Sequence, residues 1–154
     1  MCGLSGYYHL SSSQDVQEWN GRLQRSVRTM ALRGPDAEGF YHAPHVGLGH
    51  RRLSIIDVQG GHQPLIDAVT GTVLVYNGEL YNFRELRSEL HAAGITCHTS
   101  SDSEVVLRSY LFWGADCLER FNGMFAMAIY TPSDESLFVA RDRLGVKPLF
   151  YGDV

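Results

Sequence analysis

The order in which strands and helices follow one another limits the folds open to this chain. The predicted elements occur in blocks and do not alternate regularly, which favours an α+β fold with antiparallel sheets over a doubly wound parallel sheet. Segment 57–64, which contains Gly60 and Gly61, is expected to be a loop. Strands are expected at 4–9, 39–42, 46–53, 72–76, 124–130, 136–140 and 149–151.

Three helices are expected between these strands. The first covers 15–32, where apolar residues recur at helical spacing, and it ends before Gly34 and Pro35 because both residues interrupt helices. Each of the other two begins with a capping-box-like pair, a polar residue followed three positions later by Glu. These pairs are Asn82 with Glu85 and Ser101 with Glu104.

The composition is that of a folded globular protein of one domain. Apolar residues make up 44% and charged residues 19% of the 154 residues, so the chain is long enough to bury a core. The formal net charge is −4 and no segment is a run of Lys and Arg, which disfavours nucleic acid and anionic membranes as partners. No segment resembles a signal peptide or has the roughly 20 apolar residues of a membrane helix. We therefore expect a soluble, cytoplasmic protein.

The cysteines do not form a pattern typical of disulfides or metal sites. Cys2, Cys97 and Cys117 are widely spaced and include no C-x-x-C pair, so reduced thiols are expected. Cys97 and His98 are adjacent, and on a strand their side chains would point to opposite faces. The spacing of the seven histidines is also weak for a metal site, and no bound metal is expected.

Cys2 is chemically the most informative residue. Removal of Met1 would leave a thiol and a free α-amine on one residue. The ordinary pKa values, about 8 for the amine and about 8.5 for the thiol, allow the amine to take the thiol proton near neutrality. Gly3 leaves room for a substrate carbonyl to approach. A cysteine after the initiator methionine is common by itself, so its interpretation depends on the rest of the sequence.

Six motifs occur in a defined order along nearly the whole chain. Together they resemble the class II glutamine amidotransferases, whose domain is an N-terminal-nucleophile hydrolase. Within that class, RGPD, RLSIID and YNGELYN resemble the N-terminal domain of asparagine synthetase. The motifs are CGLSG (2–6), RGPD (33–36), GHRRLSIID (49–57), YNGELYN (76–82), SDSE (101–104) and ARDRLGVKPL (140–149).

The resemblance assigns a role in catalysis to three residues. It implies that Cys2 is the nucleophile that attacks the side-chain amide of glutamine, giving a thioester and ammonia. Asn77 and Gly78 resemble the oxyanion hole, in which a side-chain amide and a backbone N–H stabilise the negative charge of the tetrahedral intermediate. A turn directly after the strand at 72–76 would hold these donors.

The resemblance also implies how the substrate is bound. Arg52 corresponds to the residue that binds the α-carboxylate, a task suited to a guanidinium group. Asp102 corresponds to the partner of the α-ammonium group, with Glu79 assisting. Leu53 and Ile56 complete the implied glutamine-binding residues, together with Asn77 and Gly78. A cationic and an anionic anchor in one site suit a free amino acid.

The resemblance further implies the architecture and the reaction. We expect a four-layer α/β/β/α sandwich over 1–154 that hydrolyses L-glutamine to L-glutamate and ammonia. The ammonia would pass to a synthetase domain, in cis or in trans, that amidates a carboxylate, with aspartate to asparagine the leading expectation. The chain contains neither a G-x-x-x-x-G-K-[ST] loop nor an S-G-G-x-D-S loop. ATP and Mg²⁺ are therefore expected to act in the synthetase domain, which this chain lacks, and no cofactor is expected here.

Several alternatives remain open from the residues alone. Asn77-Gly78 is a strong hairpin-turn signal, Asp102 could be a first-turn acid that favours the helix dipole, and Arg51 and Arg52 could be solvated strand charges. The enzyme could be another class II amidotransferase, of the phosphoribosyl-amine, glucosamine-phosphate or natural-product type. If Met1 is retained, a non-catalytic docking module gains support. Homo-oligomer formation is also open.

Overall fold

The strands of the computed structural model, which describes residues 2–10, 15–53 and 61–153, form two antiparallel sheets. The first sheet has the order β1-β3-β2 and the second the order β4-β5-β6-β7. All pairs of neighbouring strands are antiparallel. The strands are β1 (Gly3–Tyr8), β2 (Ala37–Ala43), β3 (Val46–Arg52), β4 (Leu65–Ile66), β5 (Val73–Leu80), β6 (Gly123–Thr131) and β7 (Ser136–Arg141).

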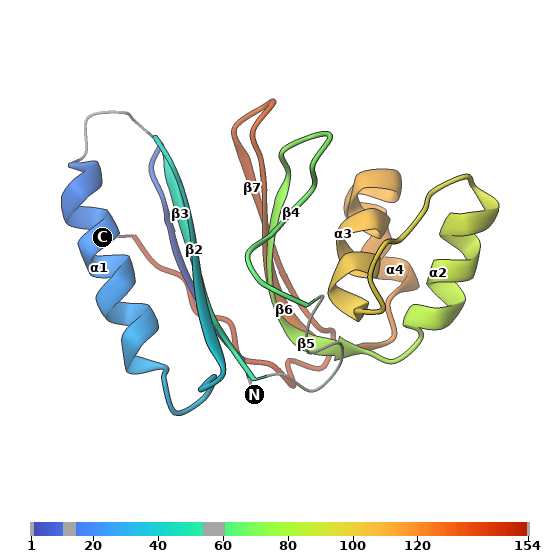
Figure 1. The fold of residues 1–154 in the computed structure, drawn as a ribbon, viewed down its shortest axis with the longest axis horizontal. Coiled ribbons are helices and arrows are strands. Elements are labelled where there is room, and N and C mark those ends of the chain that lie inside the picture. Colours follow the sequence, from blue (N-terminus) through green and yellow to red (C-terminus); the bar gives the residue numbers. More distant parts are fainter. Residues whose placement is uncertain (1, 11–14, 54–60, 154) are drawn as a thin grey trace.

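The helices cover the outer faces of the two sheets (Figure 1). Helix α1 (Val16–Thr29) lies against the first sheet, and the other helices lie on the far side of the second sheet. The four-layer α/β/β/α sandwich is thereby confirmed. No helix in the described part of the chain is long and apolar enough to cross a membrane. The remaining helices are α2 (Phe83–Ala92), α3 (Asp102–Trp113), the short 3₁₀ helix η1 (Gly114–Asp116) and α4 (Cys117–Arg120).

Two apolar cores follow from the alternation of side chains along β5. Leu74 and Tyr76 face α2 and α3 and belong to the larger core. Val73 and Val75 face the first sheet, where they pack in a second core with residues such as Leu48 of β3. The same alternation directs the side chain of Asn77, the next odd-numbered residue of β5, toward the first sheet.

Helix α1 begins with a side-chain cap and lies very close to β3. The Asp15 carboxylate accepts hydrogen bonds from the backbone N–H groups of Gln17 (2.9 Å) and Glu18 (3.2 Å). Val27 is fully buried against the sheet. A Cβ atom on Gly49 would lie 2.4 Å from Val27 Cγ2, so the glycine permits the close packing of helix and strand.

Local structure differs from expectation in several places. Helix α1 ends at Thr29 and not at residue 32, and β4, η1 and α4 were not expected. Ser101 caps α3, but Asn82 makes no side-chain cap on α2. The Asn82 amide instead binds the backbone of Arg120 (2.9 Å) and Asn122 (3.0 Å), because the chain segment that leads into β6 lies beside it. Residues 149–151, expected to be a strand, form neither helix nor strand. Strand β5 runs beyond Tyr76 to Leu80 because β6 pairs with it along that whole length.

Candidate active site

Cys2 directly precedes β1, so its thiol lies at one end of the first sheet, on the side of that sheet that faces β5. Its Sγ accepts a hydrogen bond from the Leu53 backbone N–H (3.4 Å) and lies 3.6 Å from the Leu53 carbonyl oxygen. The residue is half-buried. Met1 lies outside the described residues. The thiol is therefore held in place by the chain segment that follows β3, while one side remains open to a cavity.

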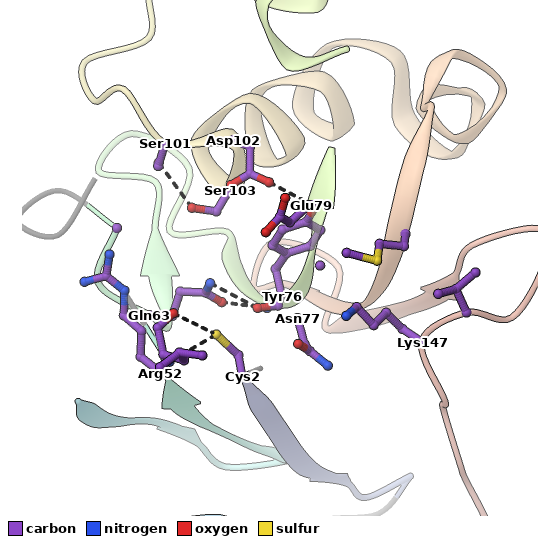
Figure 2. Close-up of a pocket in the computed structure, with 15 residues that line it drawn as sticks. Cys2, Arg52, Gln63, Tyr76, Asn77, Glu79, Ser101, Asp102, Ser103 and Lys147 are labelled. Carbon is purple, nitrogen blue, oxygen red and sulfur yellow. Dashed lines mark hydrogen bonds between the residues drawn. The ribbon is translucent and has the colours of Figure 1, made fainter. Parts of the chain in front are cut away.

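This cavity of about 440 Å³ brings together seven of the predicted site residues (Figure 2). The eighth, Ile56, lies outside the described residues. A second cavity of about 640 Å³, between the sheets, also reaches Cys2. The predicted residues that line the first cavity are Cys2, Arg52, Leu53, Asn77, Gly78, Glu79 and Asp102.

Asn77 and Gly78 lie within β5 and do not form a turn. They pair with Ala126 and Phe125 of β6, and Gly78 does not have a positive φ. The hairpin interpretation and the expected strand-to-turn position are therefore both wrong. A Cβ atom on residue 78 would lie 2.4 Å from the Met124 carbonyl oxygen, which explains why glycine occupies this position. Strand alternation directs the Asn77 side chain toward the first sheet, where Cys2 lies.

The two neighbouring arginines at the end of β3 differ in their surroundings. Arg51 forms an ion pair with Glu38 of β2 (2.9 Å), on the side of the sheet away from the cavity. Arg52 is only 6% exposed and lines the cavity. The Asp36 backbone N–H donates to the Arg52 carbonyl oxygen (3.0 Å), so the RGPD loop packs against this end of β3. A solvated strand charge does not describe Arg52.

Asp102 is the first residue of α3 and points toward β5. Its Oδ2 accepts hydrogen bonds from the Leu80 backbone N–H (3.0 Å) and the Tyr76 hydroxyl (3.2 Å). Burial raises the pKa of Asp102 above its ordinary value, although these two hydrogen bonds oppose the shift. The carboxyl group is thus oriented by β5 and not only by the dipole of its own helix.

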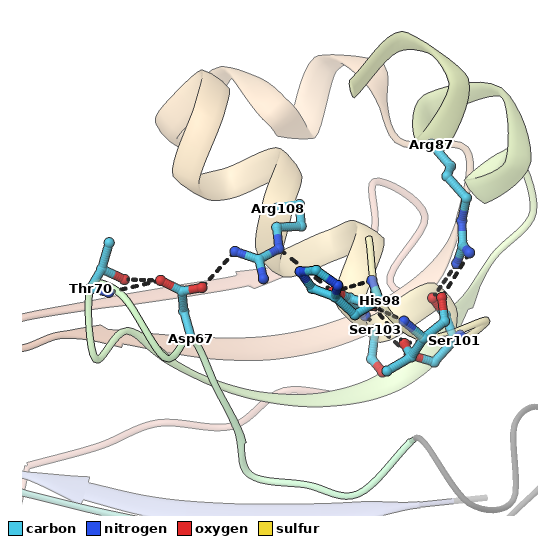
Figure 3. A network of polar contacts seen from close by, with 9 residues as sticks. Asp67, Thr70, Arg87, His98, Ser101, Ser103 and Arg108 are labelled. Carbon is cyan, nitrogen blue, oxygen red and sulfur yellow. Dashed lines mark hydrogen bonds and ion pairs between the residues drawn. The ribbon is translucent and has the colours of Figure 1, made fainter. Parts of the chain in front are cut away.

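A polar network fixes the loop that leads into α3 (Figure 3). The Glu104 carboxylate accepts hydrogen bonds from the backbone N–H groups of His98 (2.9 Å) and Thr99 (2.6 Å). Burial raises the pKa of Glu104, but these hydrogen bonds outweigh that effect and hold the pKa below its ordinary value. Arg108 binds Asp67 at the end of β4 (2.5 Å) and also lies 3.6 Å from Glu104. The network ties α3 and its N-terminal loop to the second sheet.

Several cavity residues were not expected from the sequence. Lys147 was part of a recognised motif but was given no role. The Asp142 carboxylate accepts hydrogen bonds from the backbone N–H groups of Val146 (2.8 Å) and Lys147 (2.9 Å). These bonds turn the segment toward β6. Gln63 stands directly before Pro64, and a proline beside a short strand could have indicated an interrupted ladder. The unexpected lining residues that carry polar side chains are Gln63, Tyr76, Ser101, Ser103 and Lys147.

The chemistry of the cavity is that of a thiol beside polar donors and opposite charges. In the described part of the chain, no three His, Cys, Asp or Glu side chains cluster so that they could hold a metal ion. The other two cysteines lie away from the cavity, and burial raises the pKa of Cys117 to about 12. Cys2 is thus the thiol that a ligand in this cavity would meet.

Comparison with known proteins gives one consistent family. Asparagine synthetase 3 (glutamine-hydrolysing) of Bacillus subtilis strain 168 is 44% identical over 153 residues, which are 98% of this chain and 25% of that protein. Asparagine synthetase B (glutamine-hydrolysing) of Escherichia coli strain K12 is 38% identical over 152 residues, 99% of this chain and 27% of that protein. This chain spans about a quarter of the length of the curated relatives it matches.

Solved structures have the same fold. One is the glutamine phosphoribosylpyrophosphate amidotransferase of B. subtilis, in complex with ADP and GMP. It is 25% identical, with a TM-score of 0.50 over 62% of this chain and 23% of that chain. Another, described as the allosteric regulatory enzyme of purine biosynthesis, is 22% identical, with a TM-score of 0.56 over 94% of this chain and 32% of that chain. The sequence model of the glutamine amidotransferase domain family matches residues 1–154, and the chain belongs to this family.

Proposed function

We propose that this chain hydrolyses L-glutamine to L-glutamate and ammonia, with Cys2 as the nucleophile once Met1 has been removed. The observation that carries the proposal is the position of the Cys2 thiol in one cavity with Asn77 and Gly78. The backbone of Leu53 orients the thiol, and the pairing of β5 with β6 holds the two donors. A nucleophile and rigid donors on opposite walls suit acyl transfer.

The reaction runs through a thioester. The α-amine of Cys2 takes the thiol proton, and Sγ attacks the side-chain amide carbon of glutamine. The Asn77 side-chain amide and the Gly78 N–H stabilise the oxyanion that forms. The ammonium of Cys2 then donates its proton to the leaving nitrogen, and ammonia departs. Water attacks the thioester with the amine again as base, which releases glutamate and restores the thiol.

Arg52 and Asp102 orient the substrate through its charged end. The Arg52 guanidinium pairs with the α-carboxylate, and Asp102 pairs with the α-ammonium group, with Glu79 beside it. Two hydrogen bonds from β5 already fix the Asp102 carboxylate. Because less side-chain freedom is lost on binding, this fixed carboxylate favours the orientation in which the amide reaches Cys2. Leu53 and Ile56 complete this binding site.

The ammonia is used by a synthetase part that lies in cis or in trans. The names of the relatives that are 36–44% identical, all glutamine-hydrolysing asparagine synthetases, support aspartate as the acceptor. ATP and Mg²⁺ would act in that part, and residues 2–10, 15–53 and 61–153 need no cofactor for the steps above. The similarity to a phosphoribosylpyrophosphate amidotransferase favours that enzyme type as the second candidate.

The test is glutamate release by the purified chain. Mass spectrometry first confirms that Cys2 is the N-terminal residue, and the chain is then incubated with glutamine without ATP or Mg²⁺. We expect glutamate and ammonia in equal amounts, none from Cys2→Ala, and no asparagine from aspartate even with ATP. If no glutamate forms, also after a matching synthetase is added, the chain is a docking module and the proposal is wrong.

A further inference from the structure

The segment before β4 approaches β5 at the residue that precedes Asn77. Leu65 pairs with Leu74 and Ile66 with Val73. Continued toward the N-terminus, this register places Pro64 opposite Val75 and Gln63 opposite Tyr76. The Asp67 N–H donates to the Thr72 carbonyl oxygen (2.9 Å), and hydrogen-bonded pairs alternate along an antiparallel ladder. Gln63 opposite Tyr76 is therefore a position at which two backbone hydrogen bonds would form, whereas Pro64 opposite Val75 is not. Strand β4 begins at Leu65, so the backbone pairing of the two strands ends before it reaches Tyr76.

The Gln63 side chain makes the two missing hydrogen bonds. Its Oε1 accepts from the Tyr76 backbone N–H (2.6 Å), and its Nε2 donates to the Tyr76 carbonyl oxygen (3.1 Å). Figure 2 shows both bonds at the wall of the cavity, close to Cys2. One amide group thus substitutes for a strand residue at this point of β5.

A second donor reaches the same carbonyl from the other sheet. His50 of β3 is fully buried, and its Nε2 lies 3.0 Å from the Tyr76 carbonyl oxygen. A carbonyl can only accept, so Nε2 carries the proton. The Tyr76 carbonyl therefore receives one hydrogen bond from Gln63 and one from His50, which together use both of its lone pairs.

These contacts act on the peptide group that leads into the proposed oxyanion hole. The Tyr76 carbonyl and the Asn77 nitrogen belong to one planar peptide unit, so holding the carbonyl also fixes the orientation of the Asn77 backbone. An oxyanion donor must be placed within about 0.5 Å to be effective. A displacement of about 1 Å can cost about 10²-fold in rate.

We propose that Gln63, together with His50, is a positioning residue for the oxyanion donors Asn77 and Gly78. This inference rests on the proposed glutaminase function. Gln63 touches the Tyr76 backbone and not the reacting atoms, so it acts through the geometry of β5. Its backbone packs closely against β2 on the other side: a Cβ atom on Gly39 would lie 2.1 Å from the Gln63 carbonyl oxygen, so only glycine fits there.

The test is the pH profile of Gln63→Glu. The new carboxylate keeps an acceptor for the Tyr76 N–H but places a negative charge against the Tyr76 carbonyl. Protonation of that carboxyl restores a donor. We expect kcat to fall about tenfold or more relative to the unsubstituted chain at about pH 8, with KM within about twofold. The ratio of variant kcat to unsubstituted kcat should recover toward one as the pH approaches about 5.

The matched control is Gln24→Glu, the same change on the exposed face of α1. The ratio of the Gln24→Glu kcat to the unsubstituted kcat should stay near one at every pH. The charged or titratable groups near Gln63 are His50, Arg52, Glu79, Asp102, Lys147 and the Cys2 amine. The ratio cancels the part of their titration that the substitution leaves unchanged. The uncharged variant Gln63→Met, described next, shows how much of the pH dependence comes from the new carboxylate. A ratio for Gln63→Glu that is flat in pH overturns the inference. An inactive unsubstituted chain instead contradicts the proposed function itself.

A second variant decides the matter if Gln63→Glu does not fold. Gln63→Met has similar length but cannot form either hydrogen bond. We expect it to lower kcat about tenfold at all pH values while KM stays within about twofold. An unchanged kcat, or a loss that appears only in KM, overturns the positioning role.

Discussion

The Tyr76 hydroxyl donates a 3.2 Å hydrogen bond to Asp102 Oδ2, which joins the middle of β5 to the first residue of α3. Tyr76 therefore holds the proposed ammonium-binding carboxylate with its side chain, while its backbone precedes Asn77. Both groups are buried. The two ends of the proposed substrate site are linked through this one residue.

Tyr76→Phe tests this link. The substitution removes about 1 kcal/mol of orienting interaction, so we expect KM for glutamine to rise roughly fivefold with little change in kcat. Loss of the hydrogen bond also raises the pKa of Asp102 further, and a neutral carboxyl binds ammonium poorly. The rise in KM toward low pH should therefore begin at a higher pH in the variant. Tyr130→Phe, in the core between the sheets, is the control; a fall in kcat alone contradicts the assignment.

Asn77→Ala and Arg52→Ala should separate chemistry from binding. Removal of the Asn77 amide is expected to lower kcat by about 10²–10³ while KM changes little, the usual cost of one oxyanion donor. Arg52→Ala should instead raise KM because the α-carboxylate loses its partner. Steady-state kinetics with glutamine distinguish the two patterns. If Asn77→Ala changes only KM, the residue has no part in the oxyanion hole.

The three cysteines should respond very differently to an alkylating agent. The Cys2 thiol is open to the cavity, whereas Cys117 is fully buried and its pKa of about 12 keeps it protonated at neutral pH. Mass spectrometry after iodoacetamide treatment should show Cys2 modified first and activity lost in parallel. Cys97→Ala and Cys117→Ala should keep activity. An uncleaved N-terminal tag should abolish activity, since it blocks the α-amine; full activity with the tag attached would refute the amine as base.

The stability of the fold should decrease in mild acid because of His50. Burial lowers the pKa of this imidazole to about 4. In the unfolded chain the His50 imidazole has its ordinary pKa of about 6.5, so between about pH 6.5 and pH 4 it is protonated in the unfolded state and neutral in the folded state. The free energy of unfolding should therefore fall as the pH drops from about 6.5 to about 4, by about 3 kcal/mol from this residue. Urea titrations at a series of pH values give the free energy of unfolding as a function of pH. This free energy should depend less steeply on pH in His50→Gln, and as steeply as in the unsubstituted chain in the exposed variant His91→Gln.

Glu104→Gln should loosen the loop before α3. Glu104 is buried and accepts from His98 and Thr99, whereas Glu89 is half-exposed and pairs with Arg120 at the surface. We expect Glu104→Gln to reduce the free energy of unfolding by about 1–3 kcal/mol and to raise KM through Asp102. Glu89→Gln should change the free energy of unfolding by less than about 1 kcal/mol. Equal effects of the two variants would show that the network has no special role.

Patterns that depend on neighbouring residues were readable from the sequence. The helical spacing of Leu23 and Val27 and the blocks of strands indicated the fold class, since burial of one helix face or one strand face imposes a period on the chain. The family resemblance that the motifs carry implied that Cys2, Arg52 and Asp102 share one site, and all three line the same cavity. The capping pair at Ser101 was also correct, because a cap involves residues only three positions apart.

Other features were decided only by the tertiary structure. Asn77-Gly78 is a turn signal by local preference, yet pairing with β6 keeps it inside a strand. Asn82 has a capping pattern, but its amide binds a chain segment about forty residues away. Gln63 acquires its contacts because the register of β4 on β5 brings Tyr76 beside it. Each outcome depends on contacts between distant segments, and local sequence preference is too weak to determine them against the packing of the whole domain.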